Sequence, residues 1–223
     1  MTTRLLLKKM YLSGKEFLTY EDIKNLCNPL NLDYKNTVNY LLRKGYLLRI
    51  FRGIFYLKSL DEIKFGKSKY SHLELISKGM ELKKVNNWYF ALYTALKLNN
   101  LTHEHFAVDY VINDKIFRAK PIKIAGYKFK FVKLKPDLFK FGIIKDSIRY
   151  SDPEKTVIDF IYIWRYNGIP EEKIIMNISD YTVRLSKNKI MEYAKNYPKT
   201  VREIAEKLDG CSSLFPLVKD VKE

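Results

Sequence analysis

The side chains best suited to chemistry lie in residues 33–57, where a predicted helix presents one polar face. This face carries amide, hydroxyl and basic groups: Lys35, Asn36, Asn39, Tyr40 and Arg43. No acidic residue occurs between residues 34 and 57, whereas a merely solvated face usually mixes both signs of charge. Asparagine and arginine form paired hydrogen bonds with adenine and guanine edges in DNA. The pattern therefore favours nucleic-acid binding over an ordinary amphipathic helix.

A helix followed at once by a hairpin must position these groups. Apolar residues at positions 34, 38, 41 and 42 share the opposite helical face, and Asp33 and Gly45 are typical start and stop residues. Residues 47–51 and 54–57 are β-branched and aromatic runs separated by Arg52-Gly53, which predicts a hairpin with a basic tip. On this hairpin we expect Arg49 and Arg52 to contact phosphates.

Two further helices precede this stretch. Residues 3–13 are rich in leucine, and Thr19 with Asp22 forms a capping-box pattern at the start of a helix over residues 20–27. Three short helices and a hairpin are the pattern of a winged helix-turn-helix, a DNA-binding fold in which one helix enters the major groove. We assign this fold to residues 1–58 and the polar residues 59–70 to a linker.

The charge distribution points to a polyanionic partner. The 223-residue chain has a net charge of +16, yet residues 151–223 hold 12 basic and 12 acidic side chains. Residues 1–58, in contrast, hold 11 Lys and Arg against 4 Asp and Glu. A compositional bias toward lysine would not leave the last third balanced. The excess of basic side chains outside the last third therefore favours nucleic acid as the binding partner, with an anionic membrane surface as the alternative.

Residues 71–223 are predicted to form a second, mixed α/β domain, so that the fold class is α+β. Residues 107–134 alternate as strands of a basic antiparallel sheet do, and on it Lys128, Lys130 and Lys133 are expected to contact phosphates. The run at residues 87–98 is apolar nearly all round and predicts a buried helix. Further helices are expected over residues 71–80, 151–166, 169–179, 184–197 and 200–208.

No catalytic or metal site is predicted. His103 and His105 lie one residue apart, but no third ligand follows at metal-binding spacing. Glu154 and Asp159 are five residues apart on the helix that Ser151 or Asp152 caps, so they point in different directions and do not form a catalytic pair. We therefore expect a protein that is not an enzyme and holds no cofactor.

Three segments together carry a family resemblance: RGIFYL at residues 52–57, WYFALYTALKLNNLT at residues 88–102 and DPEKTVIDF at residues 152–160. In this order they resemble the AbiEi-type antitoxins of type IV toxin–antitoxin and abortive-infection systems, over residues 5–165. The resemblance implies a repressor that binds double-stranded DNA at its own promoter, with a second domain that has antitoxin activity. It also implies a nucleotidyltransferase-like toxin as functional partner, which the antitoxin opposes without a stable complex.

Two other functions stay open on the sequence. A metal-dependent nuclease would need clustered carboxylates, and Asp109 and Asp114 have no obvious partner. An RNA-binding module could stack bases on the aromatic residues of the stretch 127–131.

The setting expected for the chain is the cytoplasm, away from the membrane. Cys27 and Cys211 form no CxxC pair, which fits a reducing compartment, and no apolar run has membrane-spanning length. Chains with a winged helix often bind as pairs, so inverted repeats are the expected form of the DNA site.

Overall fold

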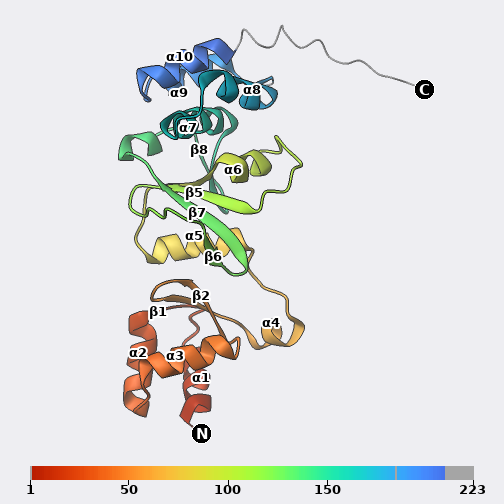
Figure 1. Ribbon diagram of the computed structural model, residues 1–223. Helices are drawn as coiled ribbons and strands as arrows, with labels where there is room; N and C mark the ends of the chain where they lie inside the picture. The colour runs from red at the N-terminus through yellow and green to blue at the C-terminus, as the bar shows by residue number, and fades with distance from the viewer. Residues whose placement is uncertain (1, 184, 209–223) are drawn as a thin grey trace, which may run out of the picture. The chain divides into compact units, whose positions relative to one another are not determined.

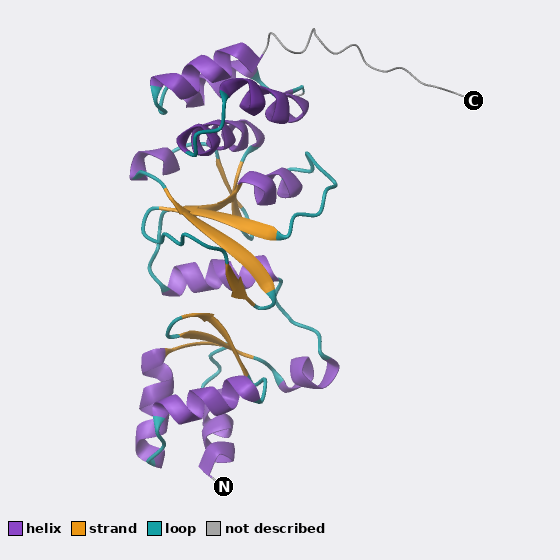
Figure 2. Ribbon diagram, viewed as in Figure 1, coloured by secondary structure: helices purple, strands orange, loops and turns teal. Residues whose placement is uncertain are grey.

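The computed structural model describes residues 2–183 and 185–208, and this part of the chain contains ten α-helices and nine β-strands (Figure 1). The strands form a three-stranded and a six-stranded sheet, so the predicted mixture of helices and sheets is confirmed (Figure 2). The chain divides into two compact units, each built from two stretches of sequence. Unit 1 comprises Met1–Asn86 and Pro121–Phe129, and unit 2 comprises Asn87–Lys120 and Lys130–Glu223.

Three helices build the N-terminal core of unit 1: α1 (Thr2–Leu12), α2 (Tyr20–Cys27) and α3 (Tyr34–Arg43). A short 3-10 turn, η1 (Asn28–Leu30), joins α2 to α3. The Thr19 side chain accepts a hydrogen bond from the Asp22 amide, and the Asp33 side chain accepts one from the Asn36 amide, so both predicted caps are confirmed. The helices bury apolar side chains against one another, among them Leu6, Met10, Ile23, Cys27, Val38 and Leu41.

The small sheet has the order β1-β3-β2, with β1 (Phe17–Thr19), β2 (Leu47–Phe51) and β3 (Ile54–Leu57). The two strands of the hairpin have their predicted bounds, whereas β1 is too short for a period-two pattern to reveal it. The register of β2 against β3 shifts between Arg49 and Phe51, which makes Ile50 the extra residue of a β-bulge.

Both faces of this sheet are covered, since all four residues of β3 are buried. Phe55 packs in the core formed with α1–α3, and helix α5 (His72–Leu82) lies against β2 and β3. The approach of α5 is close: a Cβ atom on Gly79 would stand 2.6 Å from Cγ2 of Ile50 and 2.8 Å from Cε2 of Phe51. A glycine at position 79 is therefore what allows the helix to reach the sheet.

The segment expected to be a linker contains a helix, α4 (Leu60–Phe65), which Ser59 caps. Inside it the buried Glu62 carboxylate accepts hydrogen bonds from the Tyr56 hydroxyl at 2.6 Å and from the Lys69 amide at 2.7 Å. These bonds tie the segment to β3. The compact unit accordingly continues through α5, past the domain boundary expected at residue 58.

The large sheet has the order β6-β7-β5-β4-β9-β8. Its strands are β4 (Trp88–Ala91), β5 (Val108–Asn113), β6 (Ile122–Ile124), β7 (Tyr127–Lys133), β8 (Ile143–Lys145) and β9 (Arg149–Ser151). In the stretch expected to form a basic antiparallel sheet, β6 and β7 do pair antiparallel, and β5 pairs antiparallel with β4. The sheet as a whole is mixed, because β4 pairs with β9 in parallel.

The predicted helix over residues 87–98 is wrong in its first part and confirmed from residue 92 onward. Trp88–Ala91 is strand β4, and the helix α6 begins only at Leu92 and ends at Leu98. All four residues of β4 are buried, and a central strand of this kind shows a continuous apolar run without alternation. Such a run cannot be distinguished by periodicity from a buried helix. The change of direction occurs at Leu92, where φ is +53°.

Four helices complete unit 2: α7 (Pro153–Tyr166), α8 (Glu171–Thr182), α9 (Lys187–Ala194) and α10 (Lys199–Lys207), with a 3-10 turn, η2 (Pro136–Phe139). All four were expected from the sequence, with ends that differ by a few residues. Asp152, not Ser151, caps α7. Across residues 2–183 and 185–208, no helix combines the length and the apolar character needed to cross a membrane. Cys211 lies outside the described residues.

Candidate nucleic-acid interface

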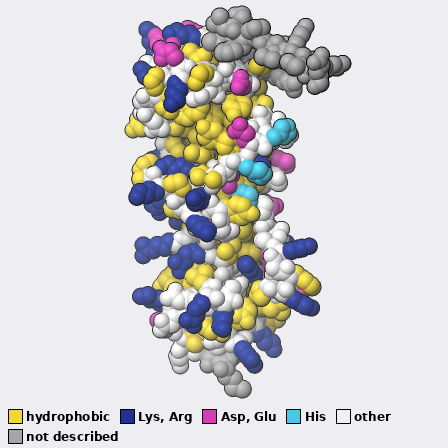
Figure 3. All heavy atoms as spheres, turned by 45° about the vertical axis from the view of Figure 1, so that its right-hand side comes forward, with side chains coloured by type: hydrophobic (Ala, Val, Ile, Leu, Met, Phe, Trp, Pro, Cys, Tyr) yellow, Lys and Arg dark blue, Asp and Glu magenta, His cyan; other side chains and the backbone are white. Residues whose placement is uncertain are grey.

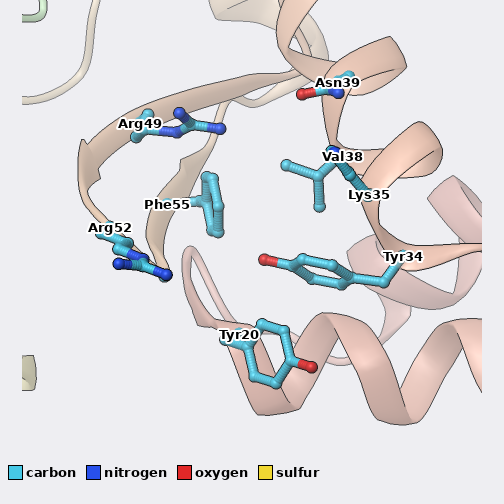
Figure 4. A pocket seen from close by; sticks show the side chains of 9 residues that line it. Tyr20, Tyr34, Lys35, Val38, Asn39, Arg49, Arg52 and Phe55 are labelled. Atoms are coloured by element: carbon cyan, nitrogen blue, oxygen red, sulfur yellow. The ribbon is translucent and has the colours of Figure 1, made fainter.

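A cleft of about 720 Å³ separates α3 from the β2–β3 hairpin, and all its walls belong to unit 1 (Figure 4). From α3 it is lined by Tyr34, Lys35, Val38 and Asn39, from the hairpin by Arg49, Arg52, Gly53 and Phe55, and from the start of α2 by Tyr20. The two sequence elements predicted to bind nucleic acid therefore face each other across one concave surface.

Helix α3 presents its predicted polar face to solvent. Thr37, Val38 and Leu41 are buried and fix the helix on the core. All five side chains expected to contact DNA on this helix are exposed: Lys35, Asn36, Asn39, Tyr40 and Arg43. Since Lys35 and Asn39 also line the cleft, this face continues directly into its wall.

The hairpin holds its two arginines in different ways. The Arg49 guanidinium lies over the Phe55 ring, 5.7 Å from the centroid, and Phe55 is its cross-strand neighbour in the register. Arg52 occupies the turn beside Gly53, whose φ is +75° and whose carbonyl accepts a hydrogen bond from the Tyr20 amide. Arg49 is thus supported by an aromatic ring, while Arg52 sits at an exposed tip.

Two tyrosines form an aromatic wall that sequence reasoning missed as part of the site. The rings of Tyr20 and Tyr34 meet edge to face with centroids 4.5 Å apart. The Tyr34 hydroxyl points into the cleft (Figure 4). Burial raises the pKa of Tyr34 and outweighs the neighbouring Arg49, which acts to lower it. The hydroxyl therefore stays protonated at neutral pH and can donate a hydrogen bond. The helical period places Tyr34 on the apolar face, because the period gives the direction of a side chain but not the position of its outer atoms.

The cleft lacks compensating acid. In the part of the chain that the structure describes, none of Lys35, Arg43, Arg49 and Arg52 forms an ion pair with a carboxylate. The acids nearest in sequence lie at helix starts: Asp33 caps α3, and Glu21 and Asp22 belong to the first turn of α2. The Asp22 carboxylate accepts a hydrogen bond from the Thr19 amide and pairs with Lys15 at 2.7 Å. In Figure 3, the lower part of the face in view carries many Lys and Arg side chains and few Asp or Glu. An anion in the cleft would find several donors and no like charge.

The three lysines expected to contact phosphates from the large sheet do not share one environment. Lys128 and Lys133 are exposed, whereas Lys130 is half-buried, and its Nζ donates to the Ala119 carbonyl at 2.5 Å and lies 6.0 Å from the Phe117 ring. Lys128 belongs to unit 1, and the other two belong to unit 2. The intervening Phe129 and Phe131 are fully buried, so these rings cannot stack on the bases of an RNA.

The carboxylates considered for catalysis have structural partners. Asp109 accepts a hydrogen bond from Thr94, and Asp114 accepts one from Asn87. Glu154 accepts from Lys189 at 2.9 Å, and Asp159 is fully buried. In the described ranges no three His, Cys, Asp or Glu side chains gather as metal ligands would, and both His103 and His105 are exposed.

Asp159 belongs to a buried polar cluster in unit 2. It lies 3.5 Å from Lys155 Nζ and accepts hydrogen bonds from the hydroxyls of Tyr89 at 2.8 Å and Tyr197 at 2.6 Å. Burial lowers the pKa of Lys155 and raises the pKa of Asp159, each opposed by the charge of the other. Lys155 Nζ also lies 4.6 Å from the Phe141 ring centroid. Tyr89, Lys155 and Asp159 are fully buried and Tyr197 is buried, so these contacts join α7 to β4 and to Tyr197 in the interior of unit 2.

Comparison with known proteins gives a fold relationship. A scan against protein-family models finds no match, and a search of curated proteins finds none either. Among solved structures, the chain is similar to the crystal structure of the RV2827C protein from Mycobacterium tuberculosis, with a TM-score of 0.58 and 14% sequence identity. The match covers 91% of this chain and 74% of that chain. At this level of identity the likeness shows a shared fold.

Proposed function

We propose that the chain is a sequence-specific DNA-binding repressor whose residues 1–58 act as a winged helix-turn-helix. One observation carries the proposal: the exposed face of α3 and the arginines of the hairpin border one cleft that contains no acid. A helix of this size fits the major groove, and the hairpin beside it reaches the backbone.

The side chains divide into two roles in this proposal. Asn36, Asn39 and Arg43 read base edges from the exposed face of α3, assisted by Lys35 and Tyr40. Arg49 and Arg52 hold phosphates from the hairpin side, and Lys128, Lys130 and Lys133 add phosphate contacts from the large sheet. Phosphate contacts set the register of the duplex, so that the bases presented to α3 are fixed.

The resemblance to AbiEi-type antitoxins supports the biological part of the proposal. On this basis the chain represses its own promoter in the cytoplasm at inverted repeats, and opposes a nucleotidyltransferase-like toxin without a stable complex. Unit 2 would carry the antitoxin activity. It is a separate compact unit with its own core, which fits a second task.

Replacement of one base-reading residue tests the proposal. Arg43→Ala should weaken binding to the chain's own upstream duplex by about 1–3 kcal/mol, and should affect a scrambled duplex much less. Lys64→Ala is the matched control, since Lys64 is an exposed basic residue of unit 1 outside the cleft. Binding is measured by fluorescence anisotropy at fixed salt. Equal losses of affinity on both duplexes would overturn the base-reading role of α3.

A further inference from the structure

Unit 1 contains a second basic hairpin, which comes from a distant part of the sequence. Strands β6 and β7 pair with Lys123 directly opposite Lys128, and both lysines are exposed. A two-residue turn joins the strands, with φ values of +52° at Ala125 and +90° at Gly126. The hairpin belongs to unit 1 up to Phe129, although more than thirty residues separate it from the rest of that unit.

The other face of this hairpin is anchored. Ile124 and Phe129 are buried, and β6 lies against β2 of the first hairpin. At the turn, the Tyr127 ring stacks on His72 at the start of α5, with centroids 3.9 Å apart and planes 11° from parallel. The backbone of the hairpin is therefore held on unit 1, and its two lysines project from a fixed support.

The placement of the two lysines is unfavourable for the isolated protein. Like charges directly opposite in an antiparallel pair destabilise the pair. No carboxylate among the described residues pairs with Lys123 or Lys128, and the sequence from Lys115 to Lys135 contains no acid. A polyanion that binds both ammonium groups would convert this repulsion into attraction.

We propose that the β6–β7 hairpin is a second contact of unit 1 for the backbone phosphates of duplex DNA, made by Lys123 and Lys128. The inference rests on the proposed function and extends it, since Lys123 lies outside the face of α3 and its cleft. Lysine is a point charge without the fork that reads base edges, so this contact adds affinity without sequence discrimination.

Salt dependence isolates this contact. Each phosphate contact makes the slope of log affinity against log salt concentration more negative by about 0.9. The double variant Lys123→Gln/Lys128→Gln should therefore make this slope less negative by about 1.8 on native and scrambled duplexes alike. Lys64→Gln/Lys67→Gln removes two exposed lysines elsewhere in unit 1 and is the matched control, with an unchanged slope.

A charge reversal separates binding from folding. Lys123→Glu creates an ion pair with Lys128, so the melting temperature should stay equal or rise while affinity for both duplexes falls. An unchanged salt slope in the double variant would overturn the second contact, and with it the phosphate role proposed for Lys128, but would leave base reading by α3 standing. A loss confined to the native duplex would also overturn it, because the hairpin would then read bases. If the wild-type protein binds neither duplex, both proposals are overturned.

Discussion

Replacement of Gly79 by alanine tests how the first hairpin is held in place. In an ordinary exposed helix this change gains roughly 0.5–1 kcal/mol, because alanine is the better helix former. Here the new Cβ would lie 2.6 Å from Ile50 and 2.8 Å from Phe51, closer than real Cβ contacts come. Overpacking of a core typically costs 1–3 kcal/mol. We therefore expect a net loss of roughly 1 kcal/mol in the stability of unit 1.

The displaced residue is the bulged position of β2, next to Arg49, so the hairpin moves relative to α3. Duplex binding should fall even under conditions where the variant is fully folded. The assay combines urea unfolding, followed by far-UV circular dichroism, with anisotropy on a DNA duplex.

A double-mutant cycle with Ile50→Ala provides the control for Gly79→Ala. Ile50→Ala alone opens a cavity, but together with Gly79→Ala it makes room for the new methyl group, so the two losses should be less than additive. Strict additivity, or a Gly79→Ala variant that is more stable than the wild type, would refute the close packing of α5 on the sheet.

Three further changes test the buried groups and a helix cap. Lys155→Met leaves Asp159 buried without its counter-charge, so unit 2 should lose about 3–5 kcal/mol, seen as a fall in melting temperature. Burial acts to raise the pKa of Glu62, but hydrogen bonds from Tyr56 and from backbone amides outweigh it and lower the pKa. The ionised Glu62 carboxylate therefore stabilises the folded state fully above its unfolded pKa of about 4.3, and this stabilisation is lost as pH falls through the lower pKa of the folded state. In Glu62→Gln, the free energy of unfolding measured with urea should accordingly fall less steeply below about pH 4.3. An unchanged dependence on pH would contradict this. Asp33→Ala removes the cap of α3 and should cost about 1 kcal/mol, whereas Asp61→Ala, at an exposed position of α4, should cost less.

The parts of the site that the sequence predicted depend on local signals. The start of α3 at Asp33, its buried face at Val38 and Leu41, and the turn at Arg52-Gly53 all follow from residues close together in the chain. These signals are strong because capping, periodicity and turn chemistry act within a few residues.

The parts that the sequence could not predict depend on long-range packing. Trp88–Ala91 becomes a strand because β5 and β9 pair with its two edges. The residues of the run itself do not indicate which segments these partners are. The close approach of Gly79 to Ile50, and the stack of Tyr127 on His72, join segments 29 and 55 residues apart. The same holds for the cleft, whose aromatic wall combines Tyr20 with Tyr34.

The decisive test of base reading by α3 is the binding of the wild-type chain to its own upstream DNA and to a scrambled duplex, across a salt series. Phosphate contacts weaken on both duplexes as salt rises, whereas base contacts made by α3 persist only on the correct sequence. We predict that the native duplex binds more tightly than the scrambled duplex at every salt concentration. If both affinities fall together along one steep line, the chain holds DNA by charge alone, and the assignment of α3 as a reading helix is contradicted.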